Sequence, residues 1–218
     1  GVGTARRDVG AASYGGDKAI FGYGIISSVT GITNLVNNSG VVAADVSAVG
    51  TARRDVAAVG YGVDLAMFAY GDSGSKTNLK NLVTNQGVVG ANVTGVGTAR
   101  GDLAASRYGV GLGIFGYGNT GSKVSITNLV TNVGVIGTDV SGVGTARQSL
   151  AACTFGGDKA IFGFGKDGSN ETSITNLVSN VGVVAADTTG VGTAREKLGA
   201  CSFGGDKGIF AFGVDNGG

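Results

Sequence analysis

Apolar and small residues recur along the chain in short runs of strand length, separated by clusters of Gly, Asn, Asp and Ser. No long stretch shows the periodicity of an amphipathic helix. In the first repeat of the pattern the runs cover approximately residues 8–14, 18–23, 32–37 and 40–44. We interpret these runs as four strands. Gly15, Gly16 and Asp17 form the predicted hairpin turn, because glycine and aspartate suit the positive φ angles of such turns.

The same order of runs returns at intervals of 47, 47, 47 and 48 residues, marked by the recurring segment Val-Gly-Thr-Ala-Arg. The last repeat lacks the Asn-Leu-Val and Gly-Val-Val runs that close the others. We expect one domain over residues 1–218, because repeats of this kind bury apolar faces only against their neighbours. Its repeats are 1–47, 48–94, 95–141, 142–189 and the incomplete 190–218.

The second run of each repeat is almost entirely apolar, which favours a sheet covered on both faces and therefore sheets that stack on sheets. A four-stranded repeat of roughly 40–50 residues is typical of a β-propeller. We therefore predict an all-β fold, a five-fold β-propeller of four-stranded antiparallel blades, in which the last is a half-blade with two inner strands only. The alternative is a four-bladed ring with a loose tail. Because all five inner hairpins are present, we favour the five-fold ring.

The motifs also carry a family resemblance. Each repeat runs in the order Thr-Ala-Arg, small-residue strand, turn, Ala-Ile-Phe-Gly-Tyr-Gly, polar loop, Ile-Thr-Asn-Leu-Val and Gly-Val-Val, with small variations. This order resembles the kelch repeat, and in particular the divergent kelch-like repeats of bacteriophage and environmental viral proteins. The resemblance covers the whole chain. It implies a β-propeller on a virion, such as a phage tail, or on another extracellular surface.

Composition removes several function classes. The chain contains 44 glycines but no histidine, so a Ser-His-Asp triad and a His-ligated zinc are excluded. A net charge of +1 without a basic run argues against nucleic acid. No apolar run reaches the roughly 18 residues of a membrane span. We expect no enzyme activity, no cofactor and no metal. Because the chain does not begin with Met, we expect residue 1 to be an excision point.

Five arginines occupy one position of the repeat, and in a closed ring they would surround the axis on one face. Guanidinium groups arranged in this way could hold a carboxylate or a phosphate by forked hydrogen bonds. The alternative is that each arginine bonds carbonyls of its own repeat or a nearby carboxylate such as Asp8, Asp55 or Asp102, and fastens blade to blade. We favour this structural alternative. The residues concerned are Arg6, Arg53, Arg100, Arg147 and Arg195.

The loops between the second and third strands differ most among the repeats, and variable loops on a fixed scaffold commonly carry recognition. They cover residues 24–31, 71–76, 118–123 and 165–172. Three of them hold amide, carboxylate and hydroxyl groups of the kind that bind sugars, although ordinary turn chemistry explains the same residues and is the interpretation we favour. The candidate binding residues are Asp72, Lys76, Asn119, Lys123, Asp167 and Asn170.

The sequence thus indicates a non-catalytic binding or structural module whose partner is a glycan or a protein surface. One alternative is a multivalent carbohydrate-binding lectin with a shallow site in each blade, and another is a designed or recently amplified repeat with no ligand. A glycosidase using two carboxylates ranks third. The uncovered outer edge of the half-blade exposes backbone groups, so we also expect self-association there, or further repeats in the natural protein.

Overall fold

The computed structural model describes residues 2–215, and within that range every regular element is a β-strand. The first four repeats each form a three-stranded antiparallel sheet and the fifth forms a two-stranded sheet. In chain order the sheets contain β1 (Gly10–Tyr14), β2 (Lys18–Gly22) and β3 (Thr33–Val36); β4 (Ala57–Tyr61), β5 (Leu65–Ala69) and β6 (Lys80–Val83); β7 (Ala104–Tyr108), β8 (Leu112–Gly116) and β9 (Thr127–Val130); β10 (Ala151–Phe155), β11 (Lys159–Gly163) and β14 (Thr175–Val178); and β15 (Gly199–Phe203) with β16 (Lys207–Ala211).

Left-handed residues set the limits of the first two strands. Asp8 has a φ of 59° and Tyr23 a φ of 64°, and an extended strand cannot continue through that conformation. β1 therefore begins two residues after Asp8, and β2 ends just before Tyr23. The same two positions are left-handed in every repeat, which shortens the strands relative to the sequence prediction.

The fourth predicted run pairs with the third strand only through isolated bridges. Val36 faces Val42 and Thr33 faces Val46, so three steps along β3 correspond to four steps along its partner. This extra residue is a β-bulge, which interrupts the ladder and prevents a continuous fourth strand. The amide of Asn34 fills the irregularity by donating to the carbonyl of Ala43 at 3.1 Å. The other complete repeats have the same one-residue shift.

The one longer repeat has its extra residue in the loop after β11. There the chain forms a small hairpin of β12 (Lys166–Asp167) and β13 (Asn170–Glu171), in which two residues form the turn. The corresponding loops of the first three repeats close with single bridges, such as Asp72 to Lys76, around three residues. The insertion thus changes the loop and leaves the sheet unaltered.

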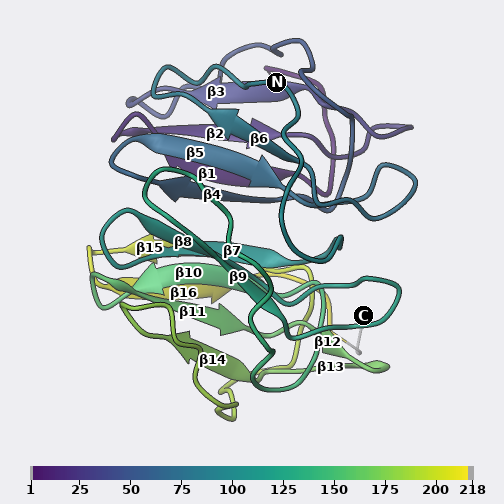
Figure 1. Ribbon diagram of the computed structural model, residues 1–218, viewed down its shortest axis with the longest axis vertical. Helices are drawn as coiled ribbons and strands as arrows, with labels where there is room; N and C mark the ends of the chain where they lie inside the picture. The colour runs from purple at the N-terminus through teal and green to yellow at the C-terminus, as the bar shows by residue number, and fades with distance from the viewer. Residues whose placement is uncertain (1, 216–218) are drawn as a thin grey trace.

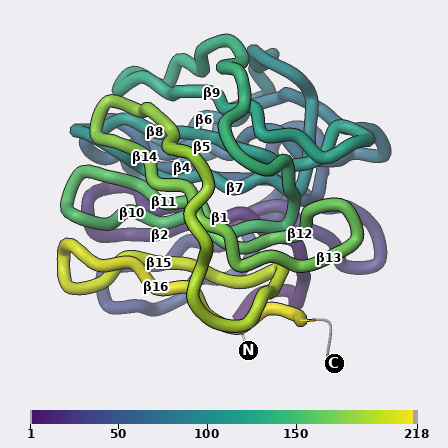
Figure 2. The backbone as a smooth tube through the Cα atoms, turned by 90° about the horizontal axis from the view of Figure 1, so that it is seen from below, coloured from purple at the N-terminus to yellow at the C-terminus, as the bar shows by residue number. Residues whose placement is uncertain are grey.

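The sheets stack side by side in chain order, because β1 contacts β4, β4 contacts β7, β7 contacts β10 and β10 contacts β15. Figure 1 shows the first two sheets in purple to blue above the third and fourth in teal to green. In Figure 2 the yellow pair β15–β16 lies beside the green strands β10 and β11, and both yellow strands contact β10. The apolar core is accordingly divided into clusters that each lie between two consecutive sheets.

Close approach of the sheets depends on glycine in the second strand. A Cβ at Gly22 would lie 2.7 Å from the ring of Phe68, and a Cβ at Gly116 would lie 2.7 Å from the ring of Phe162. Each of these rings packs edge-on against a tyrosine of the preceding repeat, as Tyr23 and Phe68 do at 5.0 Å between centroids. The apolar second strand is thus covered by a neighbouring sheet, as its composition predicts.

Candidate functional site

The repeated arginine is the centre of a buried hydrogen-bond cluster. Arg100 is fully buried, and its Nε donates to the carbonyl of Tyr117 at 2.9 Å. Its Nη1 donates to the carbonyl of Thr98 at 3.1 Å and its Nη2 to Oδ1 of Asn128 at 2.7 Å. The same three bonds are made in the other complete repeats. Three of the donor groups of each of these guanidiniums are therefore used within the arginine's own repeat.

The arginine also joins its repeat to the preceding one. The guanidinium carbon of Arg100 lies 4.3 Å from the centroid of the Tyr70 ring, a cation–π contact. The hydroxyl of Tyr70 in turn donates to the carbonyl of Val96 at 3.1 Å. Arg53, Arg147 and Arg195 lie over the corresponding rings of their preceding repeats. The guanidiniums therefore contact groups of the protein itself, as in the structural alternative in which each arginine joins neighbouring repeats.

The carboxylates near the arginines differ from those weighed from the sequence. Asp45 lies 3.8 Å from Nη1 of Arg6, and Asp139 lies 4.0 Å from Nη1 of Arg100. Each belongs to the bulged fourth run of its own repeat and also accepts hydrogen bonds from a threonine, as Asp139 does from Thr98 at 2.6 Å. These bonds and the nearby guanidinium keep the pKa of Asp139 below its ordinary value, although burial opposes the shift.

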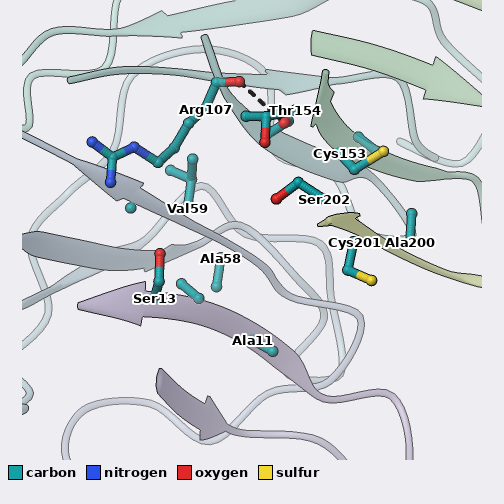
Figure 3. A pocket seen from close by; sticks show the side chains of 14 residues that line it. Ala11, Ser13, Ala58, Val59, Arg107, Cys153, Thr154, Ala200, Cys201 and Ser202 are labelled. Atoms are coloured by element: carbon teal, nitrogen blue, oxygen red, sulfur yellow. Dashed lines mark hydrogen bonds between the residues drawn. The ribbon is translucent and has the colours of Figure 1, made fainter. Parts of the chain in front are cut away.

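A central cavity of about 250 Å³ is lined by the first strands of all five repeats. Figure 3 shows Ser13, Arg107, Thr154 and Ser202 around it, each from a different strand. Cys153 also lines this cavity, and burial raises the pKa of its thiol to about 11, with Cys201 adding to the shift. Both cysteines are free, so they form no disulfide.

A second cavity, of about 540 Å³, lies where the first strands begin and is called the mouth here. It is again lined by all five repeats, at the two residues that precede each first strand. The groups that distinguish it are the carboxylates of Asp8, Asp55 and Asp102 and the cationic side chains of Arg7, Arg54, Lys76 and Lys197. The mouth is therefore a polar cavity of mixed charge.

Asp55 is the most perturbed carboxyl group of the mouth. Burial raises its pKa to about 6, and the negative charges of Asp102 and Asp8 add to the shift. Lys76 and Arg54 oppose the shift; Nε of Arg54 lies 3.5 Å from the Asp55 carboxylate. The carboxyl group thus changes its charge within a weakly acidic range.

The variable loops lie at the same end of the molecule as the mouth. Lys76 lines the mouth and pairs with Asp72 at 3.2 Å and with Asp102 of the next repeat at 3.7 Å. Asn119 bonds Gln148 of the next repeat through its amide and the N–H of Gly121 through its oxygen. Nζ of Lys123 donates to the carbonyl of Gly168, also in the next repeat. These side chains therefore brace neighbouring repeats around the mouth.

Two of the candidate loop residues belong to the extra hairpin. Asp167 lies in β12 and pairs with Asn170 in β13, and the latter side chain is exposed. Neither residue lines the mouth cavity. Of the residues proposed for binding, the structure thus brings only Lys76 directly to the cavity wall, with Asp72 bonded to it.

The sequence predicts the mouth carboxylates Asp8, Asp55 and Asp102 only as partners for the arginines. A signal for them exists in the comparison of the repeats with one another. The residue two positions after the repeated arginine is Asp, Asp, Asp, Ser and then Lys, whereas the arginine itself never changes. Because this position accepts different side chains in otherwise similar repeats, it marks a place where the chemistry of the repeats can differ without loss of the common fold.

Three negative findings limit what can be said of the site and the chain. Within residues 2–215 no group of three or more Cys, Asp or Glu side chains could hold a metal ion. Over the same range no helix is long and apolar enough to cross a membrane. Comparison with protein-family models and with curated proteins finds no match to the chain.

Proposed function

We propose that the five repeats surround one axis as a five-fold, kelch-like β-propeller in which the fifth supplies only its inner pair of strands. Two observations support this arrangement. The first strands contact one another in chain order, and residues of all five line the central cavity. The stacking of Arg100 on Tyr70, repeated at the other boundaries, would then act as the fastening between blades.

We further propose that the module is non-catalytic and binds a polar ligand, a glycan or a protein surface, at the mouth. The carrying observation is that the mouth is a cavity of about 540 Å³ lined by all five repeats, and that one position of its lining is Asp, Asp, Asp, Ser and then Lys along the chain. The hydrogen bonds and ring contacts of the repeated arginines would hold neighbouring repeats rigidly, which lowers the ordering cost of binding. A virion or another extracellular surface is the location that the kelch-like resemblance favours.

The lectin alternative places one weak site in each repeat and gains its affinity from multivalency. Outer cavities do recur between neighbouring repeats, one of about 330 Å³ near Leu35 and one of about 240 Å³ near Leu129. The cavity near Leu129 is lined mainly by valine side chains, whereas the cavity near Leu35 also presents Tyr14, Asn37 and Gln86, so the two are not copies of one sugar site. We therefore favour the mouth over a site in each repeat.

Glycan-array binding of the purified chain, followed by a peptide array, tests the proposal with a matched pair of variants. Asp102→Asn removes a mouth carboxylate, and Asp17→Asn makes the same change in the turn at the opposite end of β1. We expect the first variant to weaken binding at least tenfold and the second to leave it unchanged. If neither variant changed the binding, sites in each repeat would be favoured. If the chain bound nothing on either array, the proposal would be overturned.

A further inference from the structure

A single arginine stands among the small residues that line the central cavity. At the fourth position of the first strand the five repeats carry Ser13, Gly60, Arg107, Thr154 and Ser202, and all five residues line the cavity. Among the described residues, no aspartate, glutamate or lysine lines it. Arg107 therefore gives the central cavity a net positive charge.

The side chain of Arg107 passes over the one member of this set that has no side chain. A Cβ at Gly60 would lie 3.3 Å from Cδ of Arg107 and 3.4 Å from Oγ of Ser13. Both atoms thus lie against the same bare stretch of β4. In Figure 3 the Ser13 hydroxyl points up from its strand at the left of the cavity, the side on which the guanidinium lies. The arginine of the third repeat and the hydroxyl of the first therefore meet across Gly60.

The charge of Arg107 has no carboxylate partner. Its Nη2 donates to the carbonyl of Gly62 at 2.8 Å, and within residues 2–215 its side chain makes no other hydrogen bond and no ion pair, although Asp64 belongs to the same turn as Gly62. The third repeat has Gly111 where the other four have an aspartate, and a Cβ there would lie 2.8 Å from that same Gly62 oxygen. The repeat that carries the arginine thus lacks the turn carboxylate beside it.

The central cavity also contains hydroxyl groups that are free to donate. Over residues 2–215, the side chains of Ser13, Thr154 and Ser202 make no hydrogen bond to the protein. A hydroxyl rotates to suit its partner and can donate to an anion. A volume of about 250 Å³ corresponds to about eight waters at roughly 30 Å³ each, which is enough for an ion of the size of sulfate with part of its water shell.

From these features we propose that the central cavity binds a small tetrahedral oxyanion, sulfate or inorganic phosphate, through the guanidinium of Arg107 and the hydroxyl of Ser13. A guanidinium offers paired donors to two oxygens of such an ion, and these charge-assisted bonds are stronger than those between neutral groups. The bond to Gly62 orients the guanidinium before the ion arrives. No residue lines both the central cavity and the mouth, so the inference stands independently of the mouth ligand.

Nuclear magnetic resonance of the ¹⁵N-labelled full chain tests the proposal, with sodium sulfate and then sodium phosphate titrated against chloride at constant ionic strength. We expect saturable shift changes at the amides of Ser13, Gly60 and Arg107. Arg107→Gln keeps a donor for the Gly62 carbonyl but removes the charge, and should raise the dissociation constant about tenfold or more. Ser13→Ala should raise it about threefold or more, and the spectrum of each variant reports whether it folds.

Lys197→Gln is the control, because it removes an exposed cation from the mouth and should leave the dissociation constant unchanged. Shift changes at the mouth that weaken with Lys197→Gln and not with Arg107→Gln would overturn the proposal. Shifts that grow without saturation, or that neither Arg107→Gln nor Ser13→Ala alters, would overturn it as well. Equally tight binding of acetate would overturn the assignment of a tetrahedral ion.

Discussion

The buried arginine cluster allows a sharp prediction about stability, with Arg100→Lys as the perturbation. Lysine can replace at most one of the three hydrogen bonds that Arg100 makes, which leaves the Tyr117 carbonyl and the Asn128 side chain without their donors. Each bond to a charged group contributes about 1.5–3 kcal/mol, so the loss of two amounts to about 3–6 kcal/mol. The side chain has no exposed surface, so water cannot take the place of the lost donors.

Arg6 provides an internal comparison. It makes the same three hydrogen bonds within its repeat, but no aromatic ring of the described residues lies beneath its guanidinium, and its side chain is 6% exposed. Arg6→Lys should therefore cost less than Arg100→Lys, by up to about 1–2 kcal/mol, because a lysine ammonium reproduces only part of the contact between the guanidinium and the ring. Arg54→Lys is the surface control, because that side chain is 41% exposed and such ion pairs contribute about 0–1 kcal/mol.

Urea unfolding followed by circular dichroism measures all three variants against the parent chain, with the midpoint and the slope fitted separately. The expected order of destabilisation is Arg100→Lys, then Arg6→Lys, then Arg54→Lys. The reasoning would be refuted if Arg100→Lys cost less than about 1 kcal/mol, since a buried guanidinium bonded on three sides cannot be neutral to replace. It would also be refuted if the buried and exposed variants were indistinguishable.

Three further predictions follow from the same structure. Because the pKa of Asp55 rises from 3.8 to about 6 on folding, the folded chain binds more protons between these values, and stability should fall as pH rises through that window. Asp55→Asn should remove this fall and be more stable by about 1–2 kcal/mol near pH 7, after allowance for partial exposure; superimposable pH–stability curves would contradict this. Tyr117→Phe deletes the 3.1 Å bond to the carbonyl of Val143 and should cost about 1 kcal/mol in urea unfolding, whereas no change would show that the bond contributes nothing to stability. Deletion of residues 95–141 removes one repeat and one boundary, so the shortened chain should still fold but melt at a lower temperature; an unfolded product would show that nearest-neighbour packing is insufficient.

The sequence was most informative where structure is local. The apolar runs and the Gly-Gly-Asp turn located β1 and β2 to within two residues, because strand pattern and turn chemistry are properties of short segments. The left-handed Tyr23 was not foreseen, since an aromatic residue between glycines looks like the end of a strand. Its conformation is held by tertiary contacts, including the Arg6 Nε that bonds its carbonyl.

The mouth was beyond prediction for a different reason. Asp8, Asp55 and Asp102 are about one period apart in sequence, and only the angle between stacked sheets brings them into one cavity. That angle depends on how rings such as Phe68 pass over glycines such as Gly22, and no single repeat contains both members of the contact. The β-bulge in the fourth run could not be predicted from the sequence either, because it depends on the register between two segments.

The boundary between repeats has a consequence for how such a chain can change in length. At each of the four boundaries, a tyrosine or phenylalanine of one repeat contacts an arginine and a phenylalanine of the next repeat. An in-register recombination event in the encoding DNA would therefore join any repeat to any other without creating a new kind of interface. Gene lengthening by whole periods would then preserve every such interface, while an insertion of another size would preserve them only within a loop, as the extra residue of the fourth repeat does.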